Sequence, residues 1–524
     1  MSSFFRRIGS QVASALGVNA GEPPRARSVV DAAGNAHQVM QELGRGGQGA
    51  VFGTGNREIA VKLLLDAKGD PLRSTGSDRE RELRGAIERV LTLPLPAHGV
   101  AAPIALLREE VGYTMRMLAG MQPLARMMAV TGAPAEHYNA TGGLRRRLAI
   151  LARLADRMAS LHGAGLVFTD LSPNNVFVSQ SVEASEVWLI DPDNIHYLEQ
   201  GGRRLYTPRY GAPEIVSGRG FANTLTDCWS FAVIAHEVLR VVHPFEGESV
   251  AASGWDVTAS GVQKSGEPPL VWIDDPNDGS NRTTNGLGLA VVSTARMNAL
   301  FERAFCAGRD DPSSRASMWE WSEALWEAHD HAVACLSCRG SAFVGKQAPM
   351  SCCGAARPSL LRIESRLWIP ELDKDLTDLA QSKREFDKLG ASLDRLDPDR
   401  GAGSAGATQA PPPQRAALAT MRVSQGAAAA VPLGFTGYAA AEQRREPKID
   451  LRFVGGSLFV EVLNEHVGWS WVDGVSGKCQ PLKQKFSIEL SKRAGYLCHV
   501  HCGSETEAHR LLTFTYFPGG LNAG

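Results

Sequence analysis

Short apolar runs separated by polar residues dominate the first 125 residues and predict strands around one helix. The expected strands cover residues 51–52, 59–65 and 113–117. A helix is expected at 78–93, because its apolar residues recur at three- and four-residue spacings. These residues are Leu83, Ile87, Val90 and Leu91.

The pattern becomes mostly helical from about residue 145 and changes again after residue 330. Helices are expected at 148–162, 226–241 and 371–396. Residues 398–447 are rich in Ala, Gly, Pro and Gln, which bury too little apolar surface to fold, so they predict a linker. Alternation returns at 448–519 and predicts a small all-β domain. Two runs carry it: Ile449, Leu451, Phe453, and Leu458, Val460, Val462.

Pattern and composition together divide the chain into six parts. They are an N-terminal arm at 1–35, a large domain of strands and helices at 36–330, a cysteine module at 331–360, a helical connector at 361–397, the linker at 398–447 and the β domain at 448–519.

Charge and hydrophobicity narrow the classes of function. Lys plus Arg number 55 and Asp plus Glu number 56, so the net charge of -1 gives no general attraction for nucleic acid or an anionic membrane. No run of 18 apolar residues occurs, so a membrane-spanning helix is not expected. The polar residues in the N-terminal run argue against a secretory signal. We therefore expect a cytoplasmic protein.

A glycine-rich turn and a lysine in a strand are the first signs of chemistry. Gly44, Gly46 and Gly49 are spaced so that the backbone can approach a polyphosphate closely. Lys62 follows within an apolar strand. Because an unpaired buried ammonium is costly, this lysine needs an anionic partner, such as a nucleotide phosphate or a helix carboxylate.

Four further motifs follow in a fixed order. They are FTDLSPNN at 168–175, WLIDPD at 188–193, TPRYGAPE at 207–214 and DCWSF at 227–231. Together with the glycines and Lys62, they make the chain resemble the eukaryotic-like (Hanks-type) bacterial serine/threonine protein kinases over residues 38–330. The resemblance implies an α+β, bilobal protein-kinase fold, with a small β-rich lobe and a helical lobe.

The same resemblance implies a role for each matching residue. Asp170 would orient the substrate hydroxyl and accept its proton. Asn175 and Asp191 would hold Mg²⁺, an ion that prefers oxygen ligands. The residues that would contact ATP are Gly44, Gly46, Gly49, Val51, Ala60, Lys62, Met115, Met117, Asn175 and Asp191.

Two ion pairs also follow from the resemblance. The carboxylate that partners Lys62 is expected on the helix at 78–93. We choose Glu82, with Glu80 and Glu88 as alternatives that the spacing does not separate. The second expected pair is Glu214 with Arg315.

Several positions depart from the kinase pattern. Phe168 and Thr169 stand where the family has His and Arg, and Ser172 stands where it has a catalytic-loop lysine. Asp193 replaces the glycine of the metal motif. We interpret Asp193 as an exposed loop acid, with a place near the metal as the alternative.

The absence of an arginine at position 169 removes the usual anchor for an activation-loop phosphate. Between the metal motif and Thr207, only Tyr197 and Tyr206 carry hydroxyl groups. We therefore expect a kinase that is not switched by phosphorylation of this loop.

Three functions fit these motifs. The first is an ATP- and Mg²⁺-dependent protein kinase that acts on Ser/Thr, because Lys62, Asp170, Asn175 and Asp191 are all present. The second is an inactive pseudokinase that serves as a signalling scaffold. The third, a small-molecule kinase, is disfavoured by the TPRYGAPE motif. The resemblance also implies protein substrates and a cognate metal-dependent protein phosphatase as partners.

A cluster of cysteines lies outside the kinase motifs. Cys335 and Cys338 form a C-x-x-C pair, and Cys352 and Cys353 follow after 13 intervening residues. Two thiol pairs can complete a tetrahedron, which predicts a structural zinc site. One of His329 or His331 could replace a cysteine. Buried unligated thiols and a redox pair are the alternatives.

The run Cys498-His499-Val500-His501-Cys502 looks like a second set of metal ligands. On a strand, however, its cysteines and histidines point to opposite faces. We therefore expect this run to be a strand that packs in the core. The β domain that contains it is interpreted as a tethered recognition module.

Overall fold

The computed structural model describes most of the chain outside its N-terminal and linker segments. The described residues are 27–46, 49–130, 132–200, 204–253, 271–344, 350, 352–369, 417–441, 443–454, 457–463, 466, 468–472, 479–489, 497–504, 506–517 and 519. Most of the predicted arm, the predicted helix at 371–396 and the first part of the predicted linker lie outside these residues. None of the described helices is long and apolar enough to cross a membrane.

The chain divides into two compact units. The first unit comprises the described residues up to Ala119 together with Leu189–Ile195, and the second comprises Gly120–Trp188 and the residues from His196 onward. The metal motif at 188–193 is therefore split, with Asp191 in the first unit.

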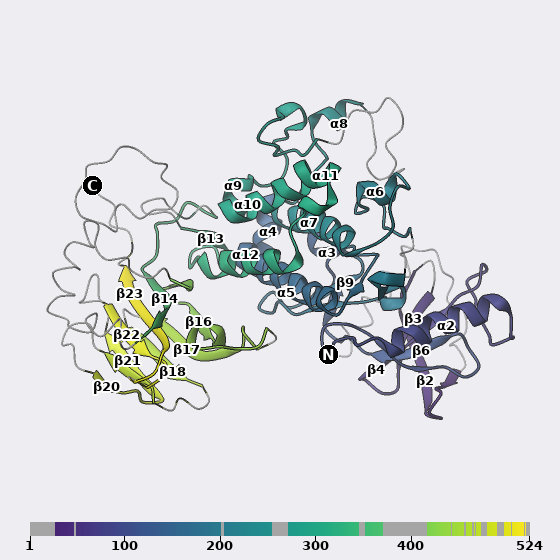
Figure 1. Ribbon diagram of the computed structural model, residues 1–524, viewed down its shortest axis with the longest axis horizontal. Coiled ribbons are helices and arrows are strands. Elements are labelled where there is room, and N and C mark those ends of the chain that lie inside the picture. Colours follow the sequence, from purple (N-terminus) through teal and green to yellow (C-terminus); the bar gives the residue numbers. More distant parts are fainter. Residues whose placement is uncertain are drawn as a thin grey trace. The chain divides into compact units, whose positions relative to one another are not determined.

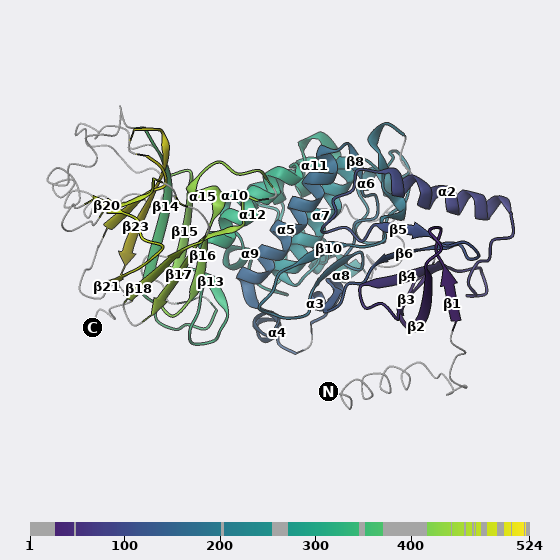
Figure 2. The ribbon, with the colours of Figure 1, turned by 90° about the horizontal axis from the view of Figure 1, so that it is seen from below.

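An antiparallel sheet with strand order β1-β2-β3-β4-β6-β5 forms the first unit (Figure 2). Its strands are β1 (Arg27–Val30), β2 (Ala36–Arg45), β3 (Gly49–Thr54), β4 (Ile59–Leu64), β5 (Pro103–Leu106) and β6 (Gly112–Arg116). The three strands predicted from the sequence are confirmed as parts of β3, β4 and β6. Residues 27–30, expected within the peripheral arm, instead pair with β2 as an edge strand.

Helix α2 (Asp78–Thr92) covers one face of this sheet and confirms the predicted helix. The Ser77 side chain caps its N-terminus by accepting from the Glu80 N–H. Ile87 packs with Leu64 and Tyr113, while Val61 pairs with Leu63 in a second apolar cluster. Alternation along β4 therefore places Lys62 on the Leu64 side of the sheet, towards α2.

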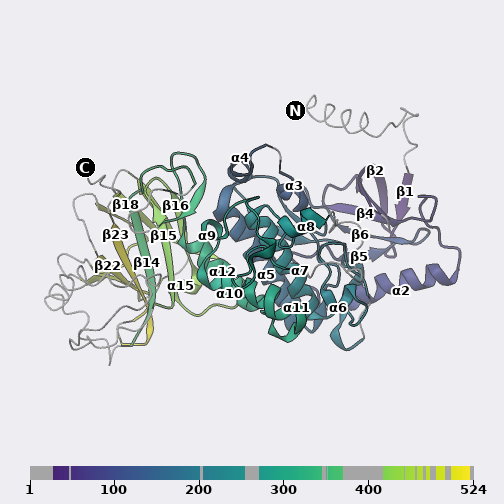
Figure 3. The same ribbon diagram turned by 90° about the horizontal axis from the view of Figure 1, so that it is seen from above.

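Helices form the larger part of the second unit up to residue 331 (Figure 3). They are α3 (Ala125–Met128), α4 (Pro134–Ala140), α5 (Gly143–Gly163), α6 (Pro213–Val216), α7 (Thr224–Arg240), α8 (Glu248–Ser253), α9 (Leu289–Val292), α10 (Ala295–Glu302), α11 (Gly308–Asp310) and α12 (Met318–His331). Helix α5 packs against both α7 and α12.

Short strands and single helical turns connect these helices. The strands are β7 (Met121–Pro123), β8 (Leu166–Val167), β9 (Val176–Ser179), β10 (Val187–Leu189) and β11 (His196–Tyr197). The helical turns are η2 (Leu198–Gln200), η3 (Gly279–Asn281), η4 (Arg303–Ala307, a π-helix) and η5 (Pro312–Ser314). A further turn, η1 (Pro192–Asn194), belongs to the first unit.

The two long helices predicted in this region are confirmed. Asn223 caps α7 through a reciprocal capping box with Thr226. Helix α5 begins at Gly143, before the predicted start at residue 148, because its apolar face already includes Leu144. Buried aromatic rings fill the space between the helices, with Phe301 4.9 Å from Trp321 between ring centroids.

A β-sandwich forms the C-terminal part of the second unit (Figure 1). One sheet has the order β15-β14-β23-β22-β19-β20 and the other the order β16-β17-β18-β21. The strands are β14 (Leu360–Trp368), β15 (Ala419–Ser424), β16 (Ala428–Pro432), β17 (Pro447–Val454), β18 (Ser457–Val462), β19 (Ser470–Val472), β20 (Cys479–Pro481), β21 (Lys485–Glu489), β22 (Leu497–His501) and β23 (His509–Phe517), with the short helix α15 (Leu433–Thr436).

Residues from both sheets share one apolar core, which includes Ile363, Val423, Phe453, Val460 and Phe514. The alternation predicted at 449–453 and 458–462 is confirmed, since its apolar residues are buried there. Two predicted boundaries are wrong. Strand β14 occupies the start of the expected helical connector, and β15 and β16 lie within the expected linker.

Candidate active site

Lys62 is a buried ammonium held by two carboxylates of the first unit. Its Nζ lies 3.0 Å from Asp191 Oδ1 and also contacts Asp193 Oδ2. The side chain of Lys62 is 6% exposed, whereas that of Asp191 is 46% exposed. Burial alone would lower the pKa of Lys62, but Tyr113, Asp193 and Asp191 raise it well above its ordinary value. The lysine therefore carries a positive charge.

Asp193 is not the exposed loop acid that the sequence suggested. Its side chain is 17% exposed and lies between Lys62 and Tyr113. The Tyr113 hydroxyl donates to Asp193 Oδ1 over 2.9 Å, and Lys62 Nζ is 5.6 Å from the centroid of the Tyr113 ring. Asp193 is therefore fixed by two partners, one charged and one neutral.

The predicted pair of Lys62 with Glu82 is wrong. Glu82 is exposed on α2, as is Glu88. Glu80 is buried but is used locally: it accepts from the Ser74 hydroxyl and from the N–H groups of Thr75 (2.5 Å) and Gly76 (2.6 Å). The carboxylates on Lys62 come instead from the loop around η1.

The glycine-rich turn joins β2 to β3. The Gly46 N–H donates to the Gly49 carbonyl over 2.9 Å, which closes the turn. A Cβ on Gly49 would lie 2.8 Å from the Leu63 carbonyl oxygen, so only glycine fits there without a shift. Gly47 and Gln48 lie outside the described residues.

The other predicted nucleotide contacts lie on the same sheet. In the ladder, Gly44 faces Val51, Val51 faces Lys62, and Ala60 faces Met115. The N–H of Met117 donates to the Glu58 carbonyl over 2.8 Å. The sheet thus brings the predicted nucleotide-binding residues of the first unit onto neighbouring strands.

Asp170 and Asn175 lie together in the second unit. Asn175 Nδ2 donates to the Asp170 carbonyl (2.9 Å) and to its Oδ2 (3.3 Å). The Thr207 hydroxyl donates to Asp170 Oδ1 over 2.7 Å. Ser172, at the position of the missing lysine, is buried. Asp170 therefore already accepts a hydrogen bond from an aliphatic hydroxyl.

Asp227 holds the backbone that precedes Asp170. Its carboxylate is buried and accepts from the N–H groups of Phe168 (2.8 Å) and Thr169 (3.0 Å). His162 lies 3.1 Å from the same carboxylate. Thr169 has a φ of 79°, a left-handed conformation that costs energy for a residue with a Cβ. These bonds stabilise that conformation and thereby the position of Asp170.

The predicted pair of Glu214 with Arg315 is confirmed. It is bidentate, with distances of 2.7 and 2.8 Å. Arg315 also donates to the carbonyls of Gly308 and Leu225, and its guanidinium lies 5.0 Å from the Trp229 ring. This pair joins the end of the TPRYGAPE motif to the helical core.

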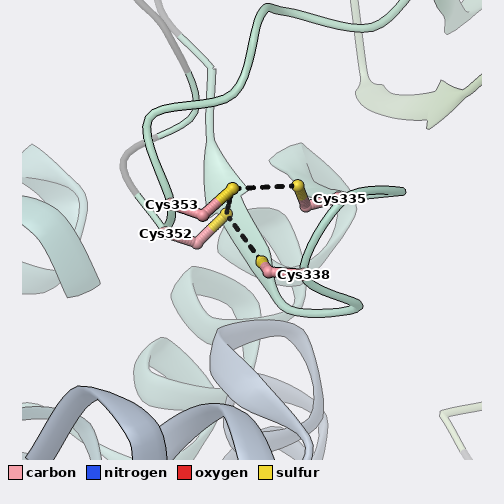
Figure 4. Close-up of side chains that lie close together, drawn as sticks. All are labelled: Cys335, Cys338, Cys352 and Cys353. Carbon is pink, nitrogen blue, oxygen red and sulfur yellow. Dashed lines mark hydrogen bonds between the residues drawn. The ribbon is translucent and has the colours of Figure 1, made fainter.

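The four cysteines of the predicted metal module come together (Figure 4). The Sγ atoms of Cys335 and Cys353 are 3.5 Å apart, as are those of Cys338 and Cys352. All four are free thiols. Burial alone would raise the pKa of Cys335, but the N–H groups of Cys338 and Ser337 lower it to about 7. Neither His329 nor His331 belongs to the group within the described residues.

The second suspected metal run is a core strand, as expected. Val500 and Cys502 pack into the sandwich core. On the opposite side, His501 Nδ1 lies 2.9 Å from His509 Nε2, and His499 lies 3.1 Å from the Thr513 hydroxyl. Within the described residues these side chains form no metal-binding group.

Two contacts around the predicted residues were not foreseen. Tyr113 supports Asp193, and the Thr207 hydroxyl contacts Asp170. Tyr113 carries one signal that could have revealed it, since it is a polar aromatic residue within an apolar strand next to that of Lys62. Thr207 opens the TPRYGAPE motif, but no local pattern shows that its hydroxyl reaches Asp170.

Comparison with known proteins finds similarity to protein kinases over part of the chain. Residues 130–283 match the protein kinase domain model. The chain is 28% identical to the serine/threonine-protein kinase pkn2 of Myxococcus xanthus, over 40% of this chain and 25% of that protein. It is 28% identical to the DNA damage-responsive serine/threonine-protein kinase RqkA of Deinococcus radiodurans, over 41% and 31% of the two chains. It is 25% identical to PknE of Mycobacterium tuberculosis, over 42% and 37%.

The matched region spans well under half the length of each of these relatives. The match and the site together define a protein kinase domain. Over this region the chain is similar to the Hanks-type bacterial serine/threonine kinases.

Proposed function

We propose that this protein transfers the γ-phosphate of ATP to Ser/Thr hydroxyls of protein substrates. The contact between Thr207 and Asp170 carries the proposal. A carboxylate that accepts a hydrogen bond from a threonine hydroxyl over 2.7 Å can orient a substrate hydroxyl in the same way and take its proton.

The nucleotide side of the proposal rests on the first unit. Around Gly44 and Gly46 no atom lies within 4 Å of the position that a Cβ would take, and Lys62 supplies a buried positive charge for phosphate oxygens. Lys62 now contacts carboxylates, and ATP phosphates would offer it another set of anionic oxygens. These features fit a polyphosphate ligand.

Asp191 and Asn175 are the proposed magnesium ligands. Both offer oxygen donors, and Asp191 keeps nearly half of its side chain exposed. Bound Mg²⁺ would neutralise charge on the phosphates during transfer. Asn175 also donates to the Asp170 carbonyl. The same residue would therefore bind the metal and hold the loop that carries Asp170.

The proposal includes activity without phosphorylation of the activation loop. The Thr169 hydroxyl lies 3.2 Å from His196 Nδ1, so a side-chain contact joins the catalytic loop to the activation segment. An arginine that needs a phosphate partner is absent at this position. The segment therefore has a local anchor that does not depend on modification.

The alternative is a pseudokinase scaffold, favoured by Ser172. This residue is buried and carries no charge, so the transferring phosphate would lack one cation. A scaffold would bind ATP, as judged by a rise in melting temperature, without transferring phosphate.

Transfer from labelled ATP to a generic protein acceptor, followed by phosphoamino-acid analysis, separates the two functions. We expect phosphoserine and phosphothreonine with the wild type and a loss of at least about 100-fold with Asp191→Ala. Nucleotide-dependent stabilisation without any transfer would favour the scaffold.

The proposal also assigns a structural Zn²⁺ to the four cysteines, apart from phosphoryl transfer. A cognate metal-dependent phosphatase that reverses the modification rests on the family resemblance alone.

A further inference from the structure

The cysteine cluster joins two structural parts of the second unit. Cys335 and Cys338 lie in the turn between β12 (Ala332–Ala334) and β13 (Ser341–Phe343), directly after α12. Cys352 and Cys353 lie shortly before β14, the first strand of the sandwich. The thiols therefore connect the end of the helical part with the start of the sandwich.

The sulfur positions have the spacing of metal ligands. The close Sγ–Sγ distances are 3.5, 3.5 and 4.0 Å, and all four atoms lie within 4.8 Å of one another. Zinc–thiolate bonds of about 2.3 Å in a tetrahedron place sulfurs about 3.8 Å apart. A disulfide would need about 2.0 Å.

The surrounding core is too small to hold these loops together alone. Its buried members are Cys335, Ala342 and Met350, with a few half-buried neighbours. The hairpin has three residues in each strand. Segments of this size generally need a metal or disulfides to fold, because they bury little apolar surface.

The module contacts the helical part on one side. The Ser341 hydroxyl accepts from the Arg145 N–H over 2.7 Å, at the start of α5. Arg145 Nη1 donates to the Ala332 carbonyl over 3.1 Å. These two bonds fix both strands of the hairpin to one helix.

On its other side the module contacts the sandwich. Arg422 of β15 donates to the Val344 carbonyl over 3.3 Å. Leu336, within the C-x-x-C turn, packs so closely on Gly426 that a Cβ there would lie 2.9 Å from Leu336 Cδ2. The turn that carries two of the thiols is therefore in direct contact with the sandwich.

We propose that Cys335, Cys338, Cys352 and Cys353 bind one Zn²⁺ and that this ion fixes the sandwich to the helical part of the second unit. A second contact, the bidentate pair of Arg445 with Asp330 (2.7 and 2.8 Å), needs no metal. Metal loss should therefore loosen the module and its neighbours without unfolding α7.

Metal content of the full-length protein tests the zinc site. We expect about one zinc per chain by elemental analysis, lost in Cys338→Ser and in Cys352→Ser. Cys479→Ser, which changes an exposed cysteine of β20, should keep the metal. A zinc-free wild type, with the thiols reduced or joined as disulfides, would overturn the site. Neither result depends on kinase activity.

Hydrogen exchange of the wild type, measured before and after zinc is removed with a chelator, tests whether the ion holds the sandwich to the helical part. This test needs no cysteine variant, so it stands even where such a variant fails to fold. Amide exchange in β12, β13 and β15 should accelerate at least about tenfold on zinc removal, while α7 stays protected. Zinc removal without faster exchange in β15 would show that the ion does not hold the sandwich.

A second inference rests on Lys62 and is independent of the cysteines. Asp193 contacts the ammonium, is only 17% exposed and is held by the Tyr113 hydroxyl. Glu80 is occupied by its own loop, and Glu82 is exposed. The geometry assigns to Asp193 the role of positioning Lys62. In the family that the chain resembles, a carboxylate on a helix has this role. This assignment rests on the proposed kinase function.

Asp193→Asn and Glu82→Gln form a matched pair of variants for this assignment. Asp193→Asn should raise the KM for ATP and lower kcat/KM at least about 30-fold at every Mg²⁺ concentration, whereas Glu82→Gln stays within about twofold. Asp193→Asn should also lower the melting temperature of the nucleotide-free protein, because Lys62 loses a buried partner.

An equal loss of kcat/KM in Glu82→Gln would show that a carboxylate of α2, and not Asp193, positions Lys62. Rescue of Asp193→Asn by high Mg²⁺ would make Asp193 a metal ligand instead. If the wild type itself transfers no phosphate, the proposed function fails, while the melting temperatures still test the contact. Unchanged melting in Asp193→Asn would then overturn the assignment.

Discussion

At the residue scale, Thr169 carries the proposal that activity does not depend on phosphorylation of the activation segment. Its backbone is held by Asp227, and its hydroxyl lies 3.2 Å from His196 Nδ1. The side chain is buried and neutral. Nothing at this position offers a positive charge to a phosphate on the activation segment.

Removal of both hydroxyls from that segment should therefore leave the enzyme active. Tyr197→Phe and Tyr206→Phe, alone and combined, are expected to keep kcat within about twofold, because both rings remain. Steady-state kinetics with mapping of phosphorylated residues provides the measurement. A stoichiometric phosphate at either tyrosine, together with a large loss of activity in its variant, would contradict this expectation.

The residues of the site differ in how far the sequence could predict them. Lys62 and Asp170 stand in contiguous motifs, so their roles could be assigned from order and spacing. The partner of Lys62 could not, because the spacing does not separate Glu82 from Glu80 or Glu88, and no local pattern indicates that Asp193 reaches Lys62. Only the fold shows that Glu82 is exposed and that Tyr113 holds Asp193 in place.

At the scale of elements, the start of α2 depends on Glu80. Its carboxylate accepts from the Ser74 hydroxyl and from two N–H groups of the preceding loop, and Arg84 lies 3.2 Å away. A negative charge in the first helical turn also suits the helix dipole. The Ser74 hydroxyl, then the N–H groups of Gly76 and Thr75, and Arg84 lower the pKa of Glu80 to about 2 against the effect of burial.

Glu80→Gln should therefore destabilise the protein in a pH-dependent way. A lowered pKa means that the carboxylate stabilises the fold fully above its ordinary pKa of 4.5 and loses this effect as the pH falls towards 2. The melting temperatures of wild type and variant should differ most near pH 7 and converge below pH 4. A difference in melting temperature that grows as the pH falls would contradict a stabilising role of the ionised Glu80 carboxylate.

Strand boundaries in the C-terminal part show where sequence patterns fail. Leu361 and Ile363 of β14 are buried and alternate correctly, but charged residues follow closely and suggested a connector. Ala-rich β16 resembles a linker in composition, yet it pairs with β17 over its whole length. Pairing with a distant strand supplies the burial that composition alone cannot reveal.

At the scale of the whole molecule, the residues assigned to phosphoryl transfer are distributed over the two units. The first holds Lys62 and Asp191, and the second holds Asp170, Asn175 and the segment with Thr207. The sandwich and the cysteine module belong to the second unit through contacts with α5 and α12. The proposed phosphoryl transfer assigns roles to residues of each unit, so a transfer assay tests all of these assignments at once.

The initial rate of γ-phosphate transfer, measured with Mg²⁺ and a protein acceptor, is the most direct test. Wild type should transfer phosphate, and Asp170→Asn should be slower by at least about 100-fold, because the amide cannot accept the substrate proton. Melting temperatures should confirm that both proteins are folded. Equal rates in the two proteins, or no transfer by a folded wild type that binds ATP, would contradict the account.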